Sequence, residues 1–230
     1  MKFIVLEGLD GSGKSTQVKL IQQYFQENNL KYKYLHFPKN EEGLFGEMVS
    51  MFLRGEFGNI DQVNPYIVAL LFAGDREHSK NTILNWLKEE YYVLVDRYVL
   101  SNIAFQTAKL HSLIEKEKLT RWIFNMEYEY FKIPRPDIEI FLDVPFSFTQ
   151  KSLENNREGD DRSYLKGKAD IHEASLNFQE NVRQEYLRCF GYSPHYHKIN
   201  CSSNDGNMLF PDIIANNIVQ LLVKEKIINH

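Results

Sequence analysis

The sequence contains little cysteine, no long apolar run and no excess of basic residues. Its two cysteines, Cys189 and Cys201, are too few for a disulfide framework or a cysteine metal site. No apolar run approaches the roughly 18 residues that a transmembrane helix needs. The apolar segment after Met1-Lys2 covers only residues 3–6, which is shorter than the core of a secretion signal. We therefore expect a cytoplasmic protein with reduced thiols and no membrane span.

The balance of charge narrows the possible partners. The chain has 27 lysines and arginines against 31 aspartates and glutamates, a net charge of −4. A broad basic surface for nucleic acid is therefore not expected, although a small phosphorylated ligand needs only a local cluster of cations. The sequence shows no internal repeat, low-complexity segment or linker. Together with a length of 230 residues, this predicts one domain over residues 1–230.

The segment 3–16, FIVLEGLDGSGKST, contains a phosphate-binding motif. Residues 8–15 fit the pattern G-x-x-x-x-G-K-[ST], and they lie between an apolar run and a segment with helical spacing, which is the context of a P-loop. Lys14 is expected to reach the β- and γ-phosphates of a nucleotide, and the Ser15 hydroxyl to bind Mg²⁺. The alternative is a glycine-rich turn that only caps a helix. The expected ATP-binding residues are Gly8, Leu9, Asp10, Gly11, Ser12, Gly13, Lys14, Ser15 and Thr16.

Apolar runs and helical spacing alternate along the chain. The runs predict five strands, at 3–6, 33–37, 91–95, 138–142 and 197–199. The spacing predicts helices at 14–28, 44–53, 65–87, 99–109, 119–131, 146–155, 171–190 and 211–227. This alternation is typical of an α/β fold with a doubly wound, five-stranded parallel sheet and helices on both faces. Ligands of such sheets bind beyond the carboxyl ends of the strands.

Two pairs of residues have the chemistry to bind a second ligand. Asp96-Arg97 follows an apolar strand, where a carboxylate can orient Mg²⁺ and an arginine can grip a phosphate with two hydrogen bonds. A structural ion pair that closes the sheet is the alternative. Phe72 and Arg76 share one face of a predicted helix because they are four residues apart. They suit the stacking and hydrogen bonding of a base, or else a core aromatic beside a solvated arginine.

The polar segment 157–170 predicts a mobile lid. It contains Arg157 and Arg162 on a charged, glycine-containing stretch. A lid arginine can neutralise the phosphoryl group during its transfer. Solvent-exposed charge without a catalytic role is the alternative.

In their order and spacing these motifs resemble the thymidylate kinase family of P-loop nucleoside monophosphate kinases. The resemblance covers nearly the whole chain. It rests on EGLDGSGKST at 7–16, Phe37-Pro38, Phe72 with Arg76, Asp96-Arg97-Tyr98, 101–106, Arg135-Pro136-Asp137, and Asp170-Ile171-His172-Glu173 before Phe178. It implies that the chain phosphorylates dTMP to dTDP with ATP and Mg²⁺, by in-line phosphoryl transfer in dTTP biosynthesis. It also implies a homodimer.

The resemblance further implies roles for single residues. Asp10 would help to position the sugar and phosphate of the acceptor, and Arg97 would hold the dTMP phosphate. Tyr98 would lie against the deoxyribose and disfavour a 2′-hydroxyl, while Phe72 would stack on thymine and Arg76 would bond it. The expected dTMP-binding residues are Asp10, Phe37, Pro38, Lys39, Phe72, Arg76, Arg97, Tyr98, Ser101, Phe105 and Gln106. The expected metal ligands are Ser15 and Asp96.

The chain departs from the family pattern at two positions. Some members carry an arginine inside the P-loop, where this chain has Gly11, so the phosphate-stabilising arginine is expected from the lid. Some members carry an arginine two residues after the proline of the Phe-Pro pair. Here that residue is Asn40, and Lys39 beside it is expected to take the role. The expected catalytic residues are Lys14, Asp10, Arg97, Arg157 and Arg162.

Two other functions remain open at this point. A deoxynucleoside kinase would need a carboxylate base near a hydroxyl acceptor, and it typically shows Glu-Arg-Ser where this chain has Asp96-Arg97-Tyr98. A P-loop binding protein without catalysis is the second. A switch protein of that class would carry a guanine-selecting N-K-x-D motif, which the sequence lacks. A nucleotide acceptor needs no strong general base, because its phosphate oxygen is already anionic.

Overall fold

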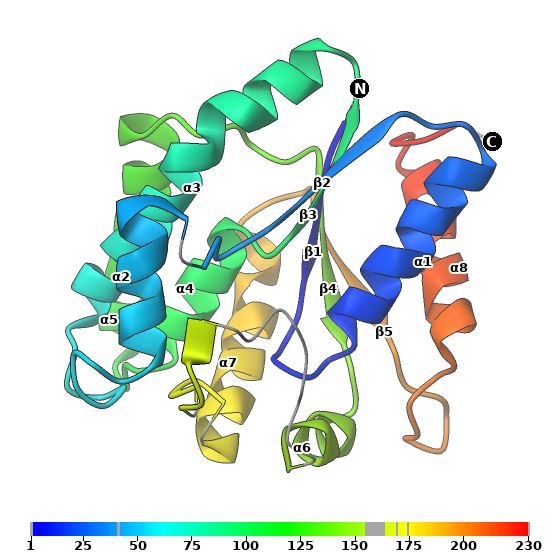
Figure 1. Ribbon diagram of the computed structural model, residues 1–230. Helices are drawn as coiled ribbons and strands as arrows, with labels where there is room; N and C mark the ends of the chain where they lie inside the picture. The colour runs from blue at the N-terminus through cyan, green and yellow to red at the C-terminus, as the bar shows by residue number, and fades with distance from the viewer. Residues whose placement is uncertain (1, 41, 155–163, 169, 174, 230) are drawn as a thin grey trace.

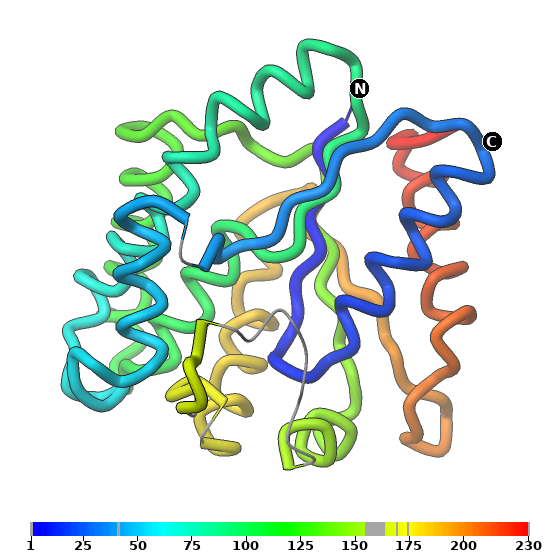
Figure 2. The backbone as a smooth tube through the Cα atoms, in the orientation of Figure 1, coloured from blue at the N-terminus to red at the C-terminus, as the bar shows by residue number. Residues whose placement is uncertain are grey.

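Five parallel strands form the centre of the protein (Figures 1 and 2). The computed structural model describes residues 2–40, 42–154, 164–168, 170–173 and 175–229. The strands are β1 (Lys2–Glu7), β2 (Tyr32–His36), β3 (Tyr92–Asp96), β4 (Ile138–Asp143) and β5 (Tyr196–Asn200). Their order across the sheet is β2-β3-β1-β4-β5, so β1 lies between β3 and β4. The predicted five-stranded parallel sheet is confirmed.

Helices cover both faces of the sheet, as predicted (Figure 1). On one face lie α1 (Lys14–Glu27) and α8 (Pro211–Lys224). The other face is covered by α3 (Pro65–Lys88), α4 (Val99–Thr107), α5 (Leu113–Phe124) and α7 (Leu176–Arg188). Helix α2 (Gly43–Leu53) packs on α3, and α6 (Phe146–Glu154) follows β4. A short 3₁₀ turn, Cys189–Gly191, follows α7.

The strand sequences explain why there are two cores. Successive side chains of a strand point to opposite faces, and a parallel strand is covered on both. In β1, Phe3 and Val5 therefore enter the core beneath α3, α4 and α7, while Ile4 and Leu6 enter the core beneath α1 and α8. All four side chains are fully buried. An unbroken apolar run is what this double coverage requires.

Three predicted helix boundaries are wrong. The helix predicted at 119–131 begins earlier, at Leu113, and it continues into a π-helical turn, Asn125–Tyr130. The helix predicted at 171–190 begins only at Leu176, because the Ser175 hydroxyl caps it by accepting a hydrogen bond from the Phe178 N–H. The last helix ends at Lys224 rather than residue 227.

The topology places the site. Because all five strands are parallel, their carboxyl ends lie at one edge of the sheet, where the residues after β1, β2 and β3 meet (Figure 2). Strand pairing aligns these ends, since Leu6 pairs with Asp96 and His36 also pairs with Asp96. None of the described helices is both long enough and apolar enough to cross a membrane.

Candidate active site

A cavity of about 700 Å³ opens at this edge of the sheet, within the usual range for a small-molecule site. Most of the residues expected to bind a ligand line it. They are Asp10, Gly11, Ser12, Gly13, Lys14, Ser15, Phe37, Pro38, Phe72, Arg76, Asp96, Arg97, Ser101, Phe105 and Gln106. Of the expected residues that the structure describes, five are not among the lining residues: Gly8, Leu9, Thr16, Lys39 and Tyr98.

The phosphate-binding loop joins β1 to α1. Gly11 and Gly13 adopt left-handed backbone angles, with φ of 72° and 81°, which residues with a Cβ rarely adopt. A Cβ on Gly11 would also lie 2.9 Å from the Ser152 Oγ. The turn brings the N-terminal end of α1 to the cavity wall. The first N–H groups of a helix have no partner within it, so this end is suited to bind an anion.

Lys14 and Asp96 supply opposite charges beside the loop. The Lys14 Nζ donates hydrogen bonds to the carbonyl oxygens of Gly8, at 3.2 Å, and Leu9, at 2.9 Å. Burial raises the pKa of Asp96, but the charge of Lys14 and a hydrogen bond with His36 lower it by more. The His36 Nδ1 lies 3.4 Å from the Asp96 Oδ2. The pKa of Asp96 is therefore lowered to about 2, and this carboxylate is ionised at neutral pH.

The oxygens of Ser15 and Asp96 fit the chemistry of Mg²⁺. The Asp96 Oδ1 is buried and has no hydrogen-bond partner among the residues that the structure describes, and Ser15 lines the same cavity. The described part of the chain contains no cluster of three or more histidine, cysteine, aspartate or glutamate side chains that could hold a metal by itself. Mg²⁺ in kinases usually takes one or two protein oxygens together with phosphates and water. The donor set therefore suits a metal that is shared with a nucleotide.

Arg97 lies in a strained conformation at the cavity wall. Its φ of 68° costs about 1–3 kcal/mol for a residue other than glycine, and such strain gathers at functional sites. Its Nη2 donates to the Asp10 Oδ1 at 2.7 Å, and its Nη1 to the Ser101 Oγ at 3.3 Å. The guanidinium carbon lies 5.1 Å from the centre of the Phe105 ring. These contacts fix the arginine toward the cavity, where it can bind an anionic group.

Glu7 holds the segment that follows Arg97 through hydrogen bonds. Its carboxylate is fully buried and accepts hydrogen bonds from the N–H groups of Tyr98 and Ser101, at 2.9 and 3.2 Å. It also accepts from the Ser101 hydroxyl, at 2.5 Å, and the Tyr186 hydroxyl, at 2.9 Å. Burial raises the pKa of Glu7, and these hydrogen bonds act in the opposite direction. Glu7 opens the motif at 7–16, but a glutamate at a strand end has no local signal that indicates this supporting role.

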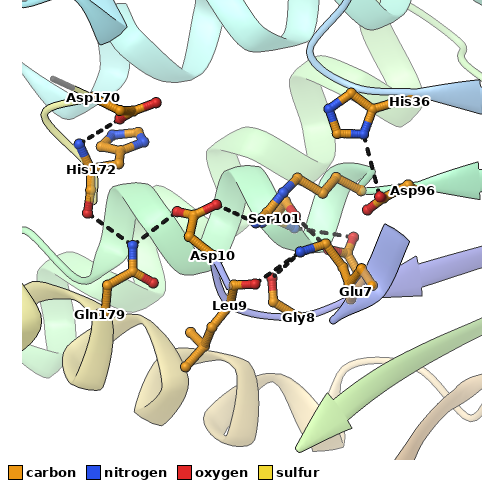
Figure 3. A network of polar contacts seen from close by, with 12 residues as sticks. Glu7, Gly8, Leu9, Asp10, His36, Asp96, Ser101, Asp170, His172 and Gln179 are labelled. Atoms are coloured by element: carbon orange, nitrogen blue, oxygen red, sulfur yellow. Dashed lines mark hydrogen bonds and ion pairs between the residues drawn. The ribbon is translucent and has the colours of Figure 1, made fainter. Parts of the chain in front are cut away.

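A chain of hydrogen bonds ties the phosphate-binding loop to α7 (Figure 3). Gln179 of α7 is fully buried, and its Nε2 donates to the Asp10 Oδ2 at 2.9 Å and to the His172 carbonyl oxygen at 2.8 Å. Since the other oxygen of Asp10 accepts from Arg97, one carboxylate joins three segments that are far apart in the sequence. Nothing local in the sequence marks Gln179 for this role.

The far end of the cavity is aromatic. Phe72 and Phe105 line it together with His172, whose ring centre lies 6.3 Å from Phe72 and 5.0 Å from Phe105. Burial holds the pKa of His172 well below its usual value, so the imidazole is neutral. Its Nε2 has no hydrogen-bond partner among the described residues. His172 belongs to the segment 170–173 that carried the resemblance, but its side chain was not expected at the cavity.

Arg76 is buried rather than solvated. Only 2% of its surface is exposed, and it lines the aromatic end of the cavity. Its Nε and Nη2 donate to the Glu127 carboxylate at 2.5 and 2.6 Å. Burial alone would lower the pKa of Arg76, but the Glu127 charge raises it, so the guanidinium stays charged. The alternative of a solvated rim arginine is therefore wrong.

Asn102 is a cavity residue that the sequence analysis missed. It lies between Ser101 and Phe105 on α4, inside the segment 101–106 that was expected beside a base. Its Nδ2 donates to the Ala69 carbonyl oxygen at 3.0 Å and to Glu127 at 2.9 Å, while its buried Oδ1 has no partner among the described residues. Its position in a segment already assigned to the base was the signal that could have identified it.

The Gln106 side chain is oriented by the partly buried Lys109. The Lys109 Nζ donates to the Gln106 Oε1 at 2.8 Å and lies 4.8 Å from the centre of the Phe52 ring. Burial lowers the pKa of Lys109 to about 7. In its charged form Lys109 can only donate, so the amide oxygen of Gln106 faces it. Gln106 lines the cavity, and its amide nitrogen is the group left to meet a ligand.

The structure places Tyr98 in the core rather than against a ligand, and Lys39 is not among the residues that line the cavity. Tyr98 is fully buried in the core, where its ring packs against Phe3 and Phe37 and its hydroxyl donates to the Pro134 carbonyl oxygen at 3.0 Å. The left-handed Arg97 that precedes it turns its side chain inward. The position beside Arg97 at the cavity is taken by Phe105 instead.

The Lys39 side chain forms an ion pair with Glu42, and its backbone N–H donates to the buried Asp75 at 2.8 Å. The neighbouring Asn40 lines the cavity instead, with a buried Oδ1 that has no partner among the described residues. The cis peptide bond between Phe37 and Pro38 precedes this turn.

The lid arginines Arg157 and Arg162 lie outside the described residues. The described end of the predicted lid is only partly solvated, because residues 166–168 are exposed and the two residues before them are buried. Tyr164 and Leu165 are buried against α2 and α3, and the Tyr164 hydroxyl donates to Asp170 at 2.8 Å. Burial raises the pKa of Asp170 to about 7.

Comparison with known proteins identifies the family of this chain. The sequence profile described as Thymidylate kinase matches residues 6–208. The chain is 34% identical to the thymidylate kinase of Plasmodium falciparum over 68% of both chains. It is 32% identical to a probable thymidylate kinase of Pyrococcus horikoshii over 93% of this chain and 94% of the relative. The chain belongs to the thymidylate kinase family.

The fold agrees with that membership. The structure of thymidylate kinase from Candida albicans superposes with a TM-score of 0.71, covering all of this chain and 95% of the other, at 22% identity. The profile match to the thymidylate kinase family includes every cavity segment from Glu7 to Gln179. The resemblance seen in the sequence motifs is thus confirmed at the level of the family.

Proposed function

We propose that this protein transfers the γ-phosphoryl group of ATP to the 5′-phosphate of dTMP, giving dTDP and ADP. The bond between the γ-phosphorus and the β,γ-bridging oxygen breaks, and a bond forms to an oxygen of the dTMP phosphate. The observation that carries the proposal is the arrangement of one cavity. The phosphate-binding loop, Arg97 and the pair Arg76 and Asn102 all line it, and Arg97 contacts both Asp10 of the loop and the Phe105 ring.

At the phosphate end, catalysis would be positioning and charge neutralisation. Lys14 would turn from the carbonyl oxygens that it now contacts to the phosphates of ATP, beside the positive end of α1. Ser15 and Asp96 would hold a magnesium ion, which when bound supplies positive charge beside the phosphates. Arg97, held by Asp10, would bind the acceptor phosphate and align it for in-line attack. The lid arginines Arg157 and Arg162 remain candidates to neutralise the charge of the phosphoryl group during its transfer.

At the base end, the exposed donor and acceptor groups fit the edge of thymine. Thymine offers an acceptor at O4 and a donor at N3, whereas cytosine offers a donor at N4 and an acceptor at N3. The Arg76 guanidinium supplies a donor, and the Oδ1 of Asn102 supplies an acceptor. Phe72 would stack on the ring, and Phe105 would lie against the deoxyribose.

A substrate panel tests the reaction. ADP release would be measured with ATP and Mg²⁺ against dTMP, dUMP, dCMP, dGMP, UMP and thymidine. We expect strong turnover with dTMP, weaker turnover with dUMP, none with thymidine, and loss of activity when EDTA removes Mg²⁺. A Lys14→Met variant gives the background that does not belong to this site. Turnover with thymidine would instead assign the chain to the nucleoside kinases.

A homodimer and a cytoplasmic location are further proposals. Ile67 and Leu70 lie three residues apart on α3 and are 54% and 37% exposed, which suits a subunit contact. Light scattering after size exclusion is expected to give about twice the chain mass of 27.1 kDa, and Ile67→Glu to give the monomer. Ile213→Glu, on the opposite side of the sheet, should leave the mass unchanged.

The proposed cytoplasmic location rests on Cys189 and Cys201, which are buried free thiols.

A further inference from the structure

Glu127 is a buried acid presented by an unusual backbone. It lies in the π-helical turn Asn125–Tyr130, between α5 and β4, and none of its surface is exposed. Short π-helical turns are rare and occur frequently at functional sites. A buried carboxylate must be paired to offset the loss of its hydration. Its partners therefore indicate what the turn positions.

The partners of Glu127 are two side chains of the cavity wall. Arg76 of α3 donates from Nε to Oε2 at 2.5 Å and from Nη2 to Oε1 at 2.6 Å. Asn102 of α4 donates from Nδ2 to the same Oε1 at 2.9 Å. Both side chains line the aromatic end of the cavity. One carboxylate thus holds both groups that face the base in the proposed complex.

These contacts decide which atoms are left for a ligand. A carboxylate only accepts hydrogen bonds, so Asn102 must turn its Nδ2 toward Glu127. The second hydrogen of this nitrogen goes to the Ala69 carbonyl oxygen. The Oδ1 of Asn102 is then left without a partner among the described residues. For Arg76, the contacts with Glu127 occupy Nε and Nη2 and leave Nη1.

We infer that Glu127 is a positioning residue for base selection, which rests on the function proposed above. It fixes the order of a donor from Arg76 next to an acceptor from Asn102, and this order matches O4 and N3–H of thymine or uracil. Cytosine presents the reverse order, so it would leave both protein groups unsatisfied. The acid itself does not touch the base and acts through its two partners.

A role as counterion alone does not account for the arrangement. A buried arginine needs a carboxylate wherever it lies, but that need does not require an amide of a second helix to share the same oxygen. A purely structural pair would also affect stability without changing which pyrimidine is accepted. Selectivity between dTMP and dCMP is therefore the measurement that separates the two roles.

The test is Glu127→Gln, assayed for kcat and KM with dTMP and dCMP. In this variant the amide nitrogen would face Arg76 or Asn102 as a donor, so Asn102 is no longer held in one orientation. We expect kcat/KM for dTMP to fall by about 10- to 100-fold, mainly through KM. The ratio of kcat/KM for dTMP over dCMP should fall by at least about tenfold, with the KM for ATP unchanged.

Glu127→Asp is the second variant, because it keeps the charge that Arg76 needs even if Glu127→Gln does not fold. A side chain shorter by one methylene cannot hold both partners, so the ratio should again fall. Glu129→Gln is the matched control, since Glu129 lies in the same turn but its side chain is 70% exposed. It should keep the ratio of the unchanged protein.

The outcomes separate the inference from the proposed function. An unchanged ratio of dTMP over dCMP in the folded variants would overturn the role of Glu127, even if the melting temperature falls. Absence of dTMP turnover in the unchanged protein would overturn the proposed function, and this inference with it. A reduced ratio together with an unchanged KM for ATP supports both.

Discussion

Replacing Arg97 with alanine is expected to lower kcat/KM for dTMP by about 100- to 1,000-fold, while the affinity for ATP stays nearly unchanged. The factor is that of removing one preorganised donor from a reaction centre. Arg97 contacts Asp10 and Ser101 on the acceptor side of the cavity, whereas the ATP phosphates are expected at Lys14 and the start of α1. The loss should therefore fall on the acceptor.

The fixed geometry of Arg97 explains why we expect a large loss of kcat/KM. Its backbone is strained and its side chain is held by Asp10, with Gln179 holding that carboxylate from the other side. An arginine that is already oriented needs no reorganisation when the phosphate arrives. Arg97→Lys should recover only part of the activity, since a lysine is a point charge that does not bind two oxygens in a fork.

Steady-state kinetics with dTMP and titration with a non-hydrolysable ATP analogue would measure this prediction. Arg121→Ala is the control, because the Arg121 side chain is 78% exposed on α5. It should leave both constants unchanged. Unaltered kcat/KM for dTMP in Arg97→Ala would rule out Arg97 as the acceptor clamp and would remove the main support for the proposed chemistry.

Replacing Glu139 with glutamine is expected to stabilise the protein at pH 8 by about 2–5 kcal/mol. Glu139 lies on β4, is 5% exposed, and its Oε1 has no hydrogen-bond partner among the described residues. Burial raises its pKa to about 8, with a further contribution from the charge of Glu7 and an opposing one from Arg135. The folded protein therefore holds this side chain neutral at pH 7.

The direction of the pH dependence follows from the proton count. Between the ordinary pKa of 4.5 and about 8, the unfolded chain has lost the Glu139 proton while the folded chain keeps it. The free energy of unfolding therefore decreases as the pH rises through this window, by about 1.4 kcal/mol per pH unit. Glutamine does not ionise in either state, so the variant lacks this contribution.

Urea denaturation of both proteins at pH 4.5 to 8.5 would give the difference curve. Asp170 also has a raised pKa, but it is present in both proteins and its contribution cancels in the difference. The stability gain should be small near pH 4.5 and largest near pH 8. Parallel curves for Glu139→Gln and the unchanged protein would contradict the prediction.

Local sequence signals were sufficient for the phosphate end of the site. The glycines, Lys14 and Ser15 are contiguous, and a strand before them and a helix after them fix their geometry within a few residues. Asp96 ends a buried strand and Arg97 follows it, so their place at the carboxyl edge required only that the sheet be parallel. Family membership followed from the order of these motifs.

The base end was decided by contacts between distant segments. Arg76 and Glu127 are 51 residues apart, and the contact of Asp10 with Gln179 spans 169 residues. Neither glutamate nor glutamine carries a local pattern that reports such a partner. The same limit explains the error at Tyr98, where the left-handed Arg97 turns the tyrosine into the core. Its motif gave the right segment but the wrong direction of the side chain.

The sequence by itself therefore determined the five-stranded parallel sheet, the phosphate-binding loop and the family. It could do so because apolar periodicity and short motifs are local properties. Only the tertiary structure decided the strand order, the burial of Arg76 and the free acceptor of Asn102. Those features depend on which helices pack together over the sheet. Buried polar groups must find partners there, and the partners come from wherever the fold brings them.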